Sequence, residues 1–338
     1  MKVAVVGGSG FLGCELLRIL AGHPELDVAL VTAGSSAGEL VSDRHPSLAG
    51  AYRSVRFEAT DVGALAGLDL VFFALPHGRS QQMMGQVLST VGAVVDLAAD
   101  FRLSDPASYE SWYKERHVAP ELIGRFAMGI PELFRQDILG SRAVAVAGCY
   151  PTAASLVLAP LLARGLVSRS GIVVDAASGV SGAGGAPSRS KLFATVDGDF
   201  RAYGLANHRH TPEMEQVLGA SVIFTPHLAP MSRGILATCY GRVRDAATST
   251  AEAMSVLRDA YDDEPFVVVT DDPPSTKATA GSNCAHLSVV VDQRTGWAIG
   301  TCALDNLVKG GSGQGVQCAN LVLGLAEGTG LPLAGVSP

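Results

Sequence analysis

The chain has 338 residues, of which 48% are hydrophobic and 17% charged, and 39 are glycine. This length is more than one hydrophobic core usually organises, so we expect two domains, and the composition suits an enzyme with buried sheets and tight turns. A net charge of −7 argues against a nucleic-acid-binding surface. With no recognisable signal sequence and no apolar run of membrane-spanning length, a cytoplasmic protein without membrane contacts is expected.

The six cysteines are scattered through the chain, and no two of them form a CxxC pair. This is neither the spacing of a disulfide framework nor that of a zinc motif. The cysteines are therefore expected to be reduced, and no metal is expected.

The N-terminal segment predicts a dinucleotide-binding unit. A strand-like run at 2–6 is followed by a glycine turn and a helical pattern, in which Gly8, Gly10 and Gly13 match GxGxxG. Such glycines let the backbone approach a pyrophosphate at a helix N-terminus, whereas a plain tight turn is the alternative. The loop residues expected to bind the cofactor are Gly7, Ser9, Gly10, Phe11, Leu12 and Gly13.

The second predicted strand, DVALVT, ends near Thr32 and bears on the choice of cofactor. NAD enzymes usually carry a carboxylate just after this strand, which holds the ribose hydroxyls. Here Ser35 and Ser36 come first, and the first acid is Glu39. Since no carboxylate repels a 2′-phosphate and the serines are able to bind one, the sequence favours NADP.

Apolar runs at 69–75, 93–98 and 143–148 predict further strands of a parallel sheet that is covered on both faces. Polar turns follow the first two runs, at the edge where open α/β sheets bind ligands. Arg102 is a candidate there for binding a substrate anion, with an ordinary surface arginine as the alternative. His77 is a candidate for lining the cofactor cleft, with a turn-capping histidine as the alternative.

The segment AGCYPTAASLVLAPL, residues 147–161, places Cys149 at the predicted start of an apolar helix. Pro151 suits the first turn of that helix. Free N–H groups and the positive end of the helix dipole favour the thiolate there, which is the reactive form of cysteine. A small buried core residue is the alternative.

After residue 165 the pattern changes to successive strands, which predicts an antiparallel sheet with one helix at about 249–262 across a face. The turn at 295–297 joins the last two strands as a hairpin. A final helix, at 313–330, is expected to return to the first domain. The strand-like segments are 171–180, 221–227, 233–244, 266–270, 286–293 and 297–305.

Two loops of the second half are candidate sites. SGVSGAGG at 178–185 offers backbone N–H groups to an anion or to the nicotinamide edge, with a flexible linker as the alternative. In NHRHTPEMEQ at 207–216, His208 and His210 alternate and are expected on one side of an extended segment. They are half a metal site at most, because no further ligand has suitable spacing. The pair is either a solvated basic loop or the acid–base partner of Cys149.

Taken together and in order, ten motifs make the chain resemble the N-acetyl-γ-glutamyl-phosphate reductase family of the semialdehyde dehydrogenase superfamily. The resemblance covers nearly the whole length. The motifs are GGSGFLG, LPHGRS, DLAADFRL, GCYPTAA, SGVSGAG, HRHTPEMEQ, FTPHLAPMSRGI, PFVVV, GSN and DNLVKGGSGQGVQ.

The resemblance implies an α/β Rossmann domain of residues 1–148 and 312–338. Residues 149–311 then form a catalytic and dimerisation α+β domain with an antiparallel or mixed sheet, similar to that of glyceraldehyde-3-phosphate dehydrogenase. The implied activity is NADPH-dependent reductive dephosphorylation of N-acetyl-γ-glutamyl phosphate to the semialdehyde, through a cysteine thioester, in arginine biosynthesis. The implied assembly is a homodimer or homotetramer.

Carried over residue by residue, the resemblance implies that Cys149 is the nucleophile and that His210, with His208 close to it, is the acid–base partner. Which of the two histidines moves the proton is left open. The substrate-binding residues implied are Arg102, Ser181 and Gly182. Besides the glycine loop, Ser35 and Ser36, the implied cofactor-binding residues are His77, Ser178, Gly179, Asn306 and Gln314.

Two departures from the family pattern stand out. Val146 and Ala147 precede Gly148 where the family usually has Asn-Pro, and Ser35 and Ser36 stand where it often has a basic residue. The second departure leaves the contacts to a 2′-phosphate open.

Three alternative functions remain at this stage. An aspartate-semialdehyde dehydrogenase shares the chemistry but has a different cysteine motif. A reductase of carrier-linked aminoadipyl phosphate in lysine biosynthesis differs only at the far end of the substrate pocket. A redox-sensing NADP-binding regulator, from another class, has no need of the paired cysteine and histidine.

Overall fold

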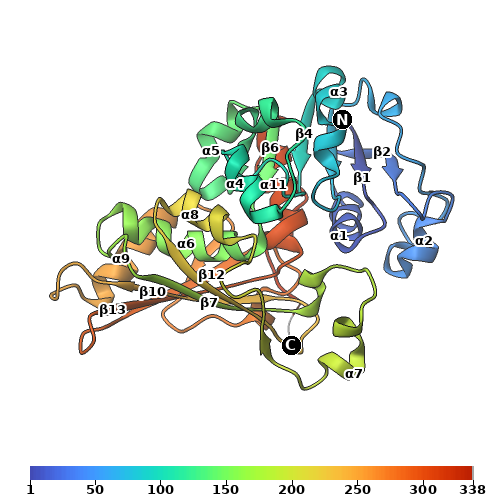
Figure 1. Ribbon diagram of the computed structural model, residues 1–338. Helices are drawn as coiled ribbons and strands as arrows, with labels where there is room; N and C mark the ends of the chain where they lie inside the picture. The colour runs from blue at the N-terminus through green and yellow to red at the C-terminus, as the bar shows by residue number, and fades with distance from the viewer. Residues whose placement is uncertain (337–338) are drawn as a thin grey trace. The chain divides into compact units, whose positions relative to one another are not determined.

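The computed structural model describes residues 1–336, so residues 337–338, which the sequence assigned to the nucleotide-binding domain, lie outside the described part. The chain divides into two compact units, the first made of residues 1–147 and 311–331 (Figure 1). The second unit contains residues 148–310 and takes in the tail at 332–336. For this tail the expected assignment is corrected, because Asn283 N–H donates to Pro332 O and Val336 N–H donates to Ala280 O.

The first unit is built on a six-stranded sheet in which all neighbouring strands are parallel, in the order β2-β1-β3-β4-β6-β5. The strands are β1 (Lys2–Val6), β2 (Asp27–Thr32), β3 (Leu70–Phe73), β4 (Ala93–Asp96), β5 (Ala127–Gly129) and β6 (Ala143–Val146). The helices are α1 (Phe11–Leu20), α2 (Val41–Arg44), α3 (Met84–Thr90), α4 (Pro106–Tyr113), α5 (Pro131–Leu139) and α11 (Gly313–Val322).

Burial explains why these strands read as continuous apolar runs. Every residue of β3, β4 and β6 is buried, because helices cover both faces of the sheet. Val71, Phe73 and Val94 belong to a core cluster with α3 on one face, and α11 packs against α5, α1 and β4. The final helix therefore returns to this unit as expected, but it ends at Val322 and not at residue 330, and Gly324 beyond it is left-handed.

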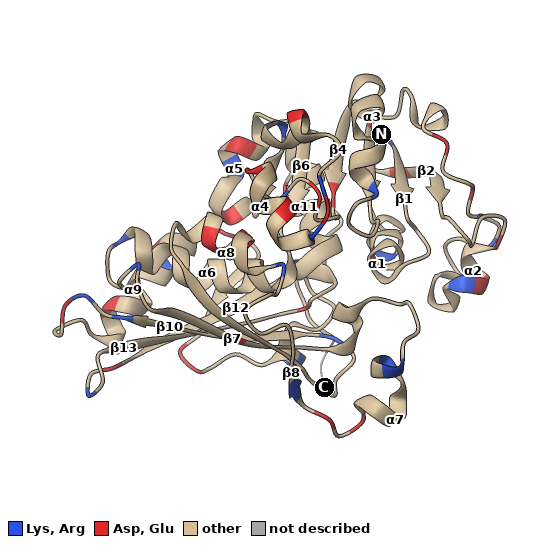
Figure 2. Ribbon diagram, in the orientation of Figure 1, with Lys and Arg blue, Asp and Glu red and all other residues tan. Residues whose placement is uncertain are grey.

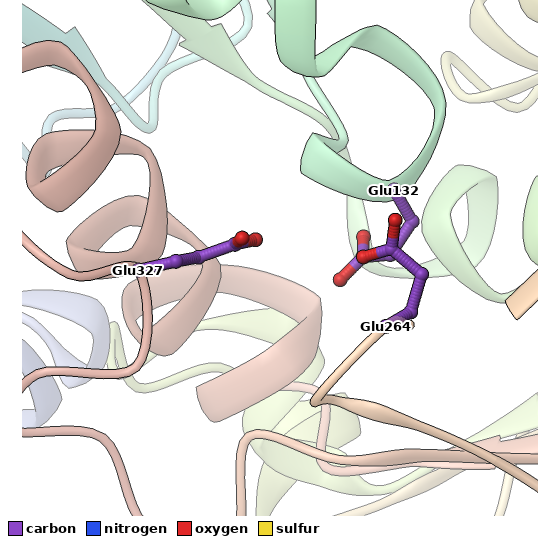
Figure 3. Close-up of side chains that lie close together, drawn as sticks. All are labelled: Glu132, Glu264 and Glu327. Carbon is purple, nitrogen blue, oxygen red and sulfur yellow. The ribbon is translucent and has the colours of Figure 1, made fainter. Parts of the chain in front are cut away.

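Polar contacts anchor the return of α11. Gln317 of α11 donates from Nε2 to Glu132 Oε1 at 2.8 Å and to Glu327 Oε1 at 2.7 Å. Arg135 of α5 forms an ion pair with Glu327 at 2.9 Å. Figure 3 draws Glu132 and Glu327, together with Glu264, which belongs to the second unit. Glu132 and Glu327 thus have structural partners within the first unit.

The second unit contains a seven-stranded sheet in the order β11-β12-β13-β10-β7-β9-β8. The sheet is mixed and not purely antiparallel, because β7 pairs with β9 and β11 with β12 in parallel after long crossover connections. The strands are β7 (Ile172–Ser178), β8 (Arg201–Ala202), β9 (Val222–Leu228), β10 (Ile235–Arg242), β11 (Val267–Val269), β12 (Ala285–Asp292) and β13 (Trp297–Leu304). The helices are α6 (Cys149–Ala163), α7 (Phe193–Val196), α8 (Thr211–Leu218), α9 (Thr250–Tyr261) and α10 (Thr276–Thr279).

Helices α6, α8 and α9 lie on one face of this sheet (Figure 1). Ser249 Oγ accepts the N–H of Glu252 and so caps α9 where the sequence predicts that helix. Side chains along the sheet alternate between the buried face and the opposite one, where Ile223, Val268 and Val290 are exposed. The face without these helices therefore carries apolar side chains.

Acidic and basic side chains are interspersed over both units (Figure 2). Among residues 1–336, no helix combines the length and the apolar character that crossing a membrane requires.

Candidate active site

Cys149 is the first residue of α6, with Gly148 as the N-cap. Gly148 O accepts both the N–H and the Oγ1–H of Thr152, at 2.9 and 3.0 Å. Pro151 lies in the first turn, where its missing N–H leaves no helical bond unmade. Cys149 and Cys14 are half-buried, whereas the other four cysteines are buried. The thiol therefore combines partial access with the positive end of a helix dipole.

His210 packs directly on the residue that precedes Cys149. A Cβ atom added to Gly148 would lie 2.6 Å from His210 Nε2 and 2.9 Å from two ring carbons. No side chain fits there, so Gly148 brings the imidazole against the start of α6. The structure thus brings together the predicted nucleophile and histidine, and it does so through a glycine.

Glu213 is a site residue that the sequence analysis missed. It lies in the first turn of α8, is 1% exposed, and its Oε1 accepts the N–H of Gly148 at 2.6 Å. Because residues three apart share a helix face, an acid three positions after His210 in HTPE was the available signal. Glu213 and His210 therefore hold Gly148 from the same helix end.

A second glycine, Gly310, packs against Cys149. A Cβ atom on Gly310 would lie 2.7 Å from Cys149 Cβ and 3.1 Å from Leu304 Cδ1. Gly310 lies within the π-helical turn Val308–Ser312. Gly310 of the VKGG motif is thus a packing requirement beside Cys149, which sequence analysis did not assign.

His208 and His210 lie in a turn and not in the extended segment that was expected. Thr211 N–H donates to His208 O at 3.0 Å, and His210 N–H donates to His208 Nδ1 at 3.2 Å. The rings are nevertheless adjacent, with centroids 4.9 Å apart. Burial, with the nearby charge of Arg209, lowers the pKa of His208 to about 4. His208 is therefore neutral near pH 7, with its remaining proton on Nε2.

Aromatic rings surround His208. Its ring centroid lies 5.7 Å from that of Tyr150, 5.5 Å from Tyr203 and 5.2 Å from Phe224. Burial raises the pKa of both tyrosines, and the charge of Cys149 acts in the same direction on each. The two hydroxyls, 3.2 Å apart, therefore stay protonated, and that of Tyr150 donates to His227 O at 3.1 Å.

Most backbone N–H groups of the loop at 178–185 are not free to form the cradle that was expected. Gly179 donates to Gly234 O, Val180 to Met231 O, and Ser181 to Ser232 O. Gly182 and Gly184 donate to carbonyls within the loop. Because a donor bonded to a carbonyl is not available to an anion, these five N–H groups do not form an anion cradle.

Asn306 holds this loop in place. Its Oδ1 accepts the N–H of Gly234 at 2.7 Å, and its Nδ2 donates to Ser181 Oγ at 3.0 Å. Ser178 is buried and donates from Oγ to Gly179 O, and a Cβ on Gly182 would lie 2.7 Å from that Oγ. The predicted residues Ser178, Gly179, Ser181, Gly182 and Asn306 thus lie together in the second unit.

The glycine loop of the first unit fits a dinucleotide pyrophosphate. Gly10 is the N-cap of α1, and a Cβ there would have only Gly7 O within 4 Å, at 3.8 Å. A Cβ on Gly13 would lie 2.4 Å from Gly7 O, so that glycine allows α1 to approach the loop. Gly7 itself has φ +91°. A pyrophosphate requires open space at the helix N-cap and a loop that packs closely on the helix and the sheet, and this loop provides both. Phe11 is exposed beside it, and Ser9 and Leu12 are half-buried.

The turn after β2 carries both predicted serines, with Ser35 exposed and Ser36 buried. Arg56 lies against the same turn, because its Nη1 donates to Gly38 O at 2.7 Å. Arg56 stands twenty residues after Ser36, so the residues that directly follow β2 give no sign of this contact.

The other predicted residues of the first unit have separate positions. Arg102 follows β4 and donates from Nη2 to Leu97 O at 2.8 Å, so its guanidinium folds back to the end of that strand. His77 is exposed, with its ring 5.7 Å from that of Tyr113. Gln314 is buried in the first turn of α11.

A parallel sheet with a dinucleotide-type glycine loop, and a mixed-sheet unit with a cysteine at a helix start, are features of a dinucleotide-dependent oxidoreductase. Two family models match the chain. "Semialdehyde dehydrogenase, NAD binding domain" matches residues 2–141, and "Semialdehyde dehydrogenase, dimerisation domain" matches residues 149–306.

Curated relatives narrow this class. An N-acetyl-gamma-glutamyl-phosphate reductase of Geobacter sulfurreducens is 47% identical and matches 98% of each chain. One of Desulforudis audaxviator is 46% identical and matches 100% of each. The chain belongs to the semialdehyde dehydrogenase family, and within it to the N-acetyl-γ-glutamyl-phosphate reductases.

Solved structures share the fold. Aspartate semialdehyde dehydrogenase II from Vibrio cholerae aligns with a TM-score of 0.70 at 16% identity, over 95% of this chain and 98% of that one. A probable aspartate-semialdehyde dehydrogenase from Pseudomonas aeruginosa aligns with a TM-score of 0.68 at 20% identity, over 96% and 98%. The expected pairing of a Rossmann domain with an α+β domain is confirmed.

Proposed function

We propose that the protein reduces N-acetyl-γ-glutamyl phosphate to N-acetylglutamate semialdehyde with NADPH, releasing phosphate, as a step of arginine biosynthesis. The observation that carries the proposal is the position of Cys149 at the start of α6, with the His210 ring against Gly148. The reductase name of relatives that match the whole chain supports the same substrate.

In this mechanism His210 takes the thiol proton, and Cys149 Sγ attacks the acyl carbon. The bond from that carbon to the phosphate oxygen breaks, phosphate leaves, and a thioester remains on Cys149. A nicotinamide cofactor held by Gly7 to Gly13 would supply the hydride that reduces the thioester carbon. The tetrahedral oxyanion then expels the thiolate, which frees the aldehyde, and His210 returns the proton. Proton transfer by a positioned histidine contributes about 10²–10⁴ in rate.

The assignment of His210 as the acid–base residue follows from the state of its neighbour. A histidine with a pKa of about 4, such as His208, is too weak a base to hold a proton taken from the thiol near pH 7. We assign His208 to positioning, through the hydrogen bond that its Nδ1 accepts from His210 N–H. Its Nε2–H is a donor for a substrate oxygen.

For the cofactor, we propose that Gly7 to Gly13 hold the pyrophosphate of NADP, and that Ser35, Ser36 and Arg56 receive the 2′-phosphate. The first acid after β2, Glu39, is exposed beyond this turn. A cation at the turn favours the phosphorylated ribose, since a charge-assisted hydrogen bond is worth more than a neutral one. We also propose cofactor contacts from His77, Ser178, Gly179, Asn306 and Gln314.

For the substrate, we propose that Arg102 binds an anionic group, and we propose Ser181 and Gly182 as further substrate contacts. Arg102 follows β4 at the ligand-binding edge of its sheet, and a guanidinium matches phosphate or carboxylate in a bidentate way. Arg102→Leu is expected to raise KM for phosphate or semialdehyde about tenfold without changing NADP affinity. Unchanged values for both substrates would remove Arg102 from the site.

The assembly and location are part of the proposal. The dimerisation-domain match and the apolar sheet face with Ile223, Val268 and Val290 support a homodimer or homotetramer formed by that face. We place the enzyme in the cytoplasm, where its reduced thiol and cofactor are maintained.

The experiment that tests the function follows absorbance of the reduced nicotinamide in the reverse direction, with purified protein, NADP and phosphate. N-acetylglutamate semialdehyde, aspartate semialdehyde and carrier-linked aminoadipate semialdehyde are compared, and the first is expected to give by far the highest kcat/KM. Cys149→Ser is expected to abolish turnover while NADP binding is retained. Preference for another semialdehyde would overturn the substrate, and near-native turnover by Cys149→Ser would overturn the mechanism.

A further inference from the structure

Two carboxyl groups of the first unit are buried side by side, separated by one hydroxyl. Asp96 is the last residue of β4, Asp100 follows in the next loop, and both are 0% exposed. Ser80 Oγ lies 2.7 Å from Asp96 Oδ2 and 2.9 Å from Asp100 Oδ2. Both distances are those of hydrogen bonds.

The geometry requires a proton on one of these carboxyl groups. Ser80 has one hydroxyl hydrogen and can donate it to only one carboxylate. The second short contact is a hydrogen bond only if the other carboxyl group is protonated and donates to Ser80 Oγ. If both carboxyl groups were ionised, one carboxylate oxygen would lie against Ser80 Oγ with no hydrogen between them, and the two buried oxygens would repel each other.

Asp100 is the better candidate for the ionised partner. Its Oδ1 accepts the N–H of Gly78 at 2.6 Å, and its Oδ2 accepts the N–H of Gln81 at 3.1 Å. Hydrogen bonds from several donors stabilise a carboxylate. Asp100 therefore accepts the hydroxyl hydrogen of Ser80, and the carboxyl group of Asp96 donates its hydrogen to Ser80 Oγ.

Asp96 is the protonated partner by the same comparison. It accepts one backbone N–H, from Ala98 at 2.9 Å, on the oxygen that does not face Ser80. Burial raises the pKa of Asp96 to about 7, and the charge of Asp100 also raises it, whereas Ser80, Ala98 and Arg102 lower it.

The other groups around the pair do not supply the missing proton. Tyr109 Oη lies 3.3 Å from Asp100 Oδ1 and 3.0 Å from Glu115 Oε1. His117 Nε2 lies 2.9 Å from the backbone oxygen of Asp100, and burial lowers the pKa of that histidine. Of these groups, Tyr109 faces the Asp100 carboxylate, and none has a hydrogen bond to Ser80 Oγ or Asp96 among the described contacts.

The turn at 76–81, which Asp96 and Asp100 hold through Ser80 and Gln81, lies next to the glycine loop at 7–13. A Cβ on Gly7 would lie 2.5 Å from Ala74 O and 3.1 Å from Leu75 Cδ2, so the glycine loop rests on the end of β3. The chain then turns through Gly78, which has φ +79°, to the anchors at Ser80 and Gln81. The position of this turn therefore depends on the carboxyl pair.

We propose that Asp96, Ser80 and Asp100 form a proton-sharing cluster that positions the turn at 76–81 beside the glycine loop, so that loss of its proton weakens dinucleotide binding. These are positioning residues and not catalytic ones. The proposal rests on the proposed function only in that the ligand of the glycine loop is NADPH.

The test measures the Kd of NADPH for the full chain by fluorescence titration between pH 5.5 and 9, without substrate. The wild-type protein is expected to bind severalfold more weakly above about pH 7. Asp96→Asn mimics the protonated carboxyl, because its amide donates to Ser80 Oγ and its oxygen accepts from Ala98 N–H. That variant is expected to match wild type at pH 6 and to keep its affinity to pH 9. Titration of the NADPH phosphate is common to both proteins and cancels in the comparison.

Two further variants complete the series. Asp100→Asn loses the acceptor for Gly78 or Gln81 and is expected to weaken binding at every pH. Asp61→Asn, an exposed aspartate of the same unit, is the matched control and is expected to behave as wild type. An Asp96→Asn protein with the wild-type pH dependence, or as weak as Asp100→Asn at pH 6, would overturn the proposal.

Infrared spectroscopy gives a readout that needs no ligand. A protonated-carboxyl band is expected in the wild-type protein at pH 6 and is expected to be missing from Asp96→Asn. Absence of that band from the wild type would overturn the shared proton even if NADPH binds. Conversely, a protein with the band and the pH effect but without activity on N-acetylglutamate semialdehyde would refute the proposed substrate and leave the cluster in place.

Discussion

Gly148 and His210 are in contact so close that no other residue is able to stand at position 148. The imidazole Nε2 lies 2.6 Å from the site that a Cβ would occupy, and a real Cβ makes no contact of that length. The helix that starts at Cys149 and the helix that starts after His210 are therefore coupled through one glycine.

Gly148→Ala is expected to displace the His210 ring and to lower kcat by roughly 10²-fold, since displacement of a catalytic group by about 1 Å has an effect of that size. Overpacking is expected to destabilise the fold by about 1–3 kcal/mol. Gly50→Ala is the matched control, because nothing lies within 4 Å of its added Cβ. Steady-state kinetics and thermal unfolding of both variants check this, and an active Gly148→Ala enzyme would contradict the contact.

Glu213→Ala is expected to leave the buried N–H of Gly148 without its acceptor, which costs about 1–3 kcal/mol of unfolding free energy and lowers kcat. Glu213→Gln retains an acceptor oxygen and should recover most of the stability. Glu215→Ala, on the same helix, removes a bond to Val222 N–H instead, so it should change stability but not kcat. Equal kcat values for the two alanine variants would show that Glu213 is not a site residue.

His210→Asn is expected to reduce kcat by about 10²–10⁴ and to flatten the pH–rate profile between pH 5 and 8. His208→Asn should act mainly on KM and leave that profile in place, because the pKa of His208 is held near 4 by burial. Profiles of kcat and kcat/KM for both variants decide between the two histidines. The opposite pattern would exchange their roles.

Arg56→Ala is expected to raise KM for NADPH about tenfold, since it removes a charge-assisted hydrogen bond to the 2′-phosphate, while KM for NADH stays the same. The neighbouring Arg53 is also exposed, and Arg53→Ala should change neither constant. The comparison requires both cofactors at one salt concentration, because exposed charges are screened. Equal effects on NADPH and NADH would place Arg56 outside the phosphate site.

The stability of the fold is expected to fall as pH rises from about 4 to about 7, because Asp96 keeps its proton in the folded state up to about pH 7. An unfolded aspartate loses its proton near pH 3.9, so over this interval the folded state binds more protons and loses stability with rising pH. Asp96→Asn should remove a loss on the order of a few kcal/mol and be more stable than wild type at pH 8 but not at pH 4. Urea unfolding at several pH values measures this, and parallel curves would contradict it.

Local signals explain the parts of the fold that were predicted correctly. Strands β1, β3, β4 and β6 are continuous apolar runs, and α6 and α9 have helical spacing with a proline or serine at the start. The glycine loop and its place between β1 and α1 depend on residues within one short window. Such features need no knowledge of distant partners, which is why the class of protein was predictable.

Elements with weak local signals were missed or misjudged. β5 and β8 have three and two residues and form because longer strands pair with them. The parallel pairing of β7 with β9 depends on a crossover of more than forty residues, so alternation within either strand does not reveal it.

By itself, the sequence determined a dinucleotide-binding sheet, a second domain rich in strands, and a cysteine at a helix start, because each is a property of neighbouring residues. Only the tertiary structure decided that His210 rests on Gly148, that Glu213 binds the N–H of Gly148, and that five N–H groups of the loop at 178–185 donate to carbonyls. The protonation of Asp96 likewise depends on burial beside Asp100. Contacts and desolvation arise when residues far apart in the chain pack together, and no local pattern encodes them.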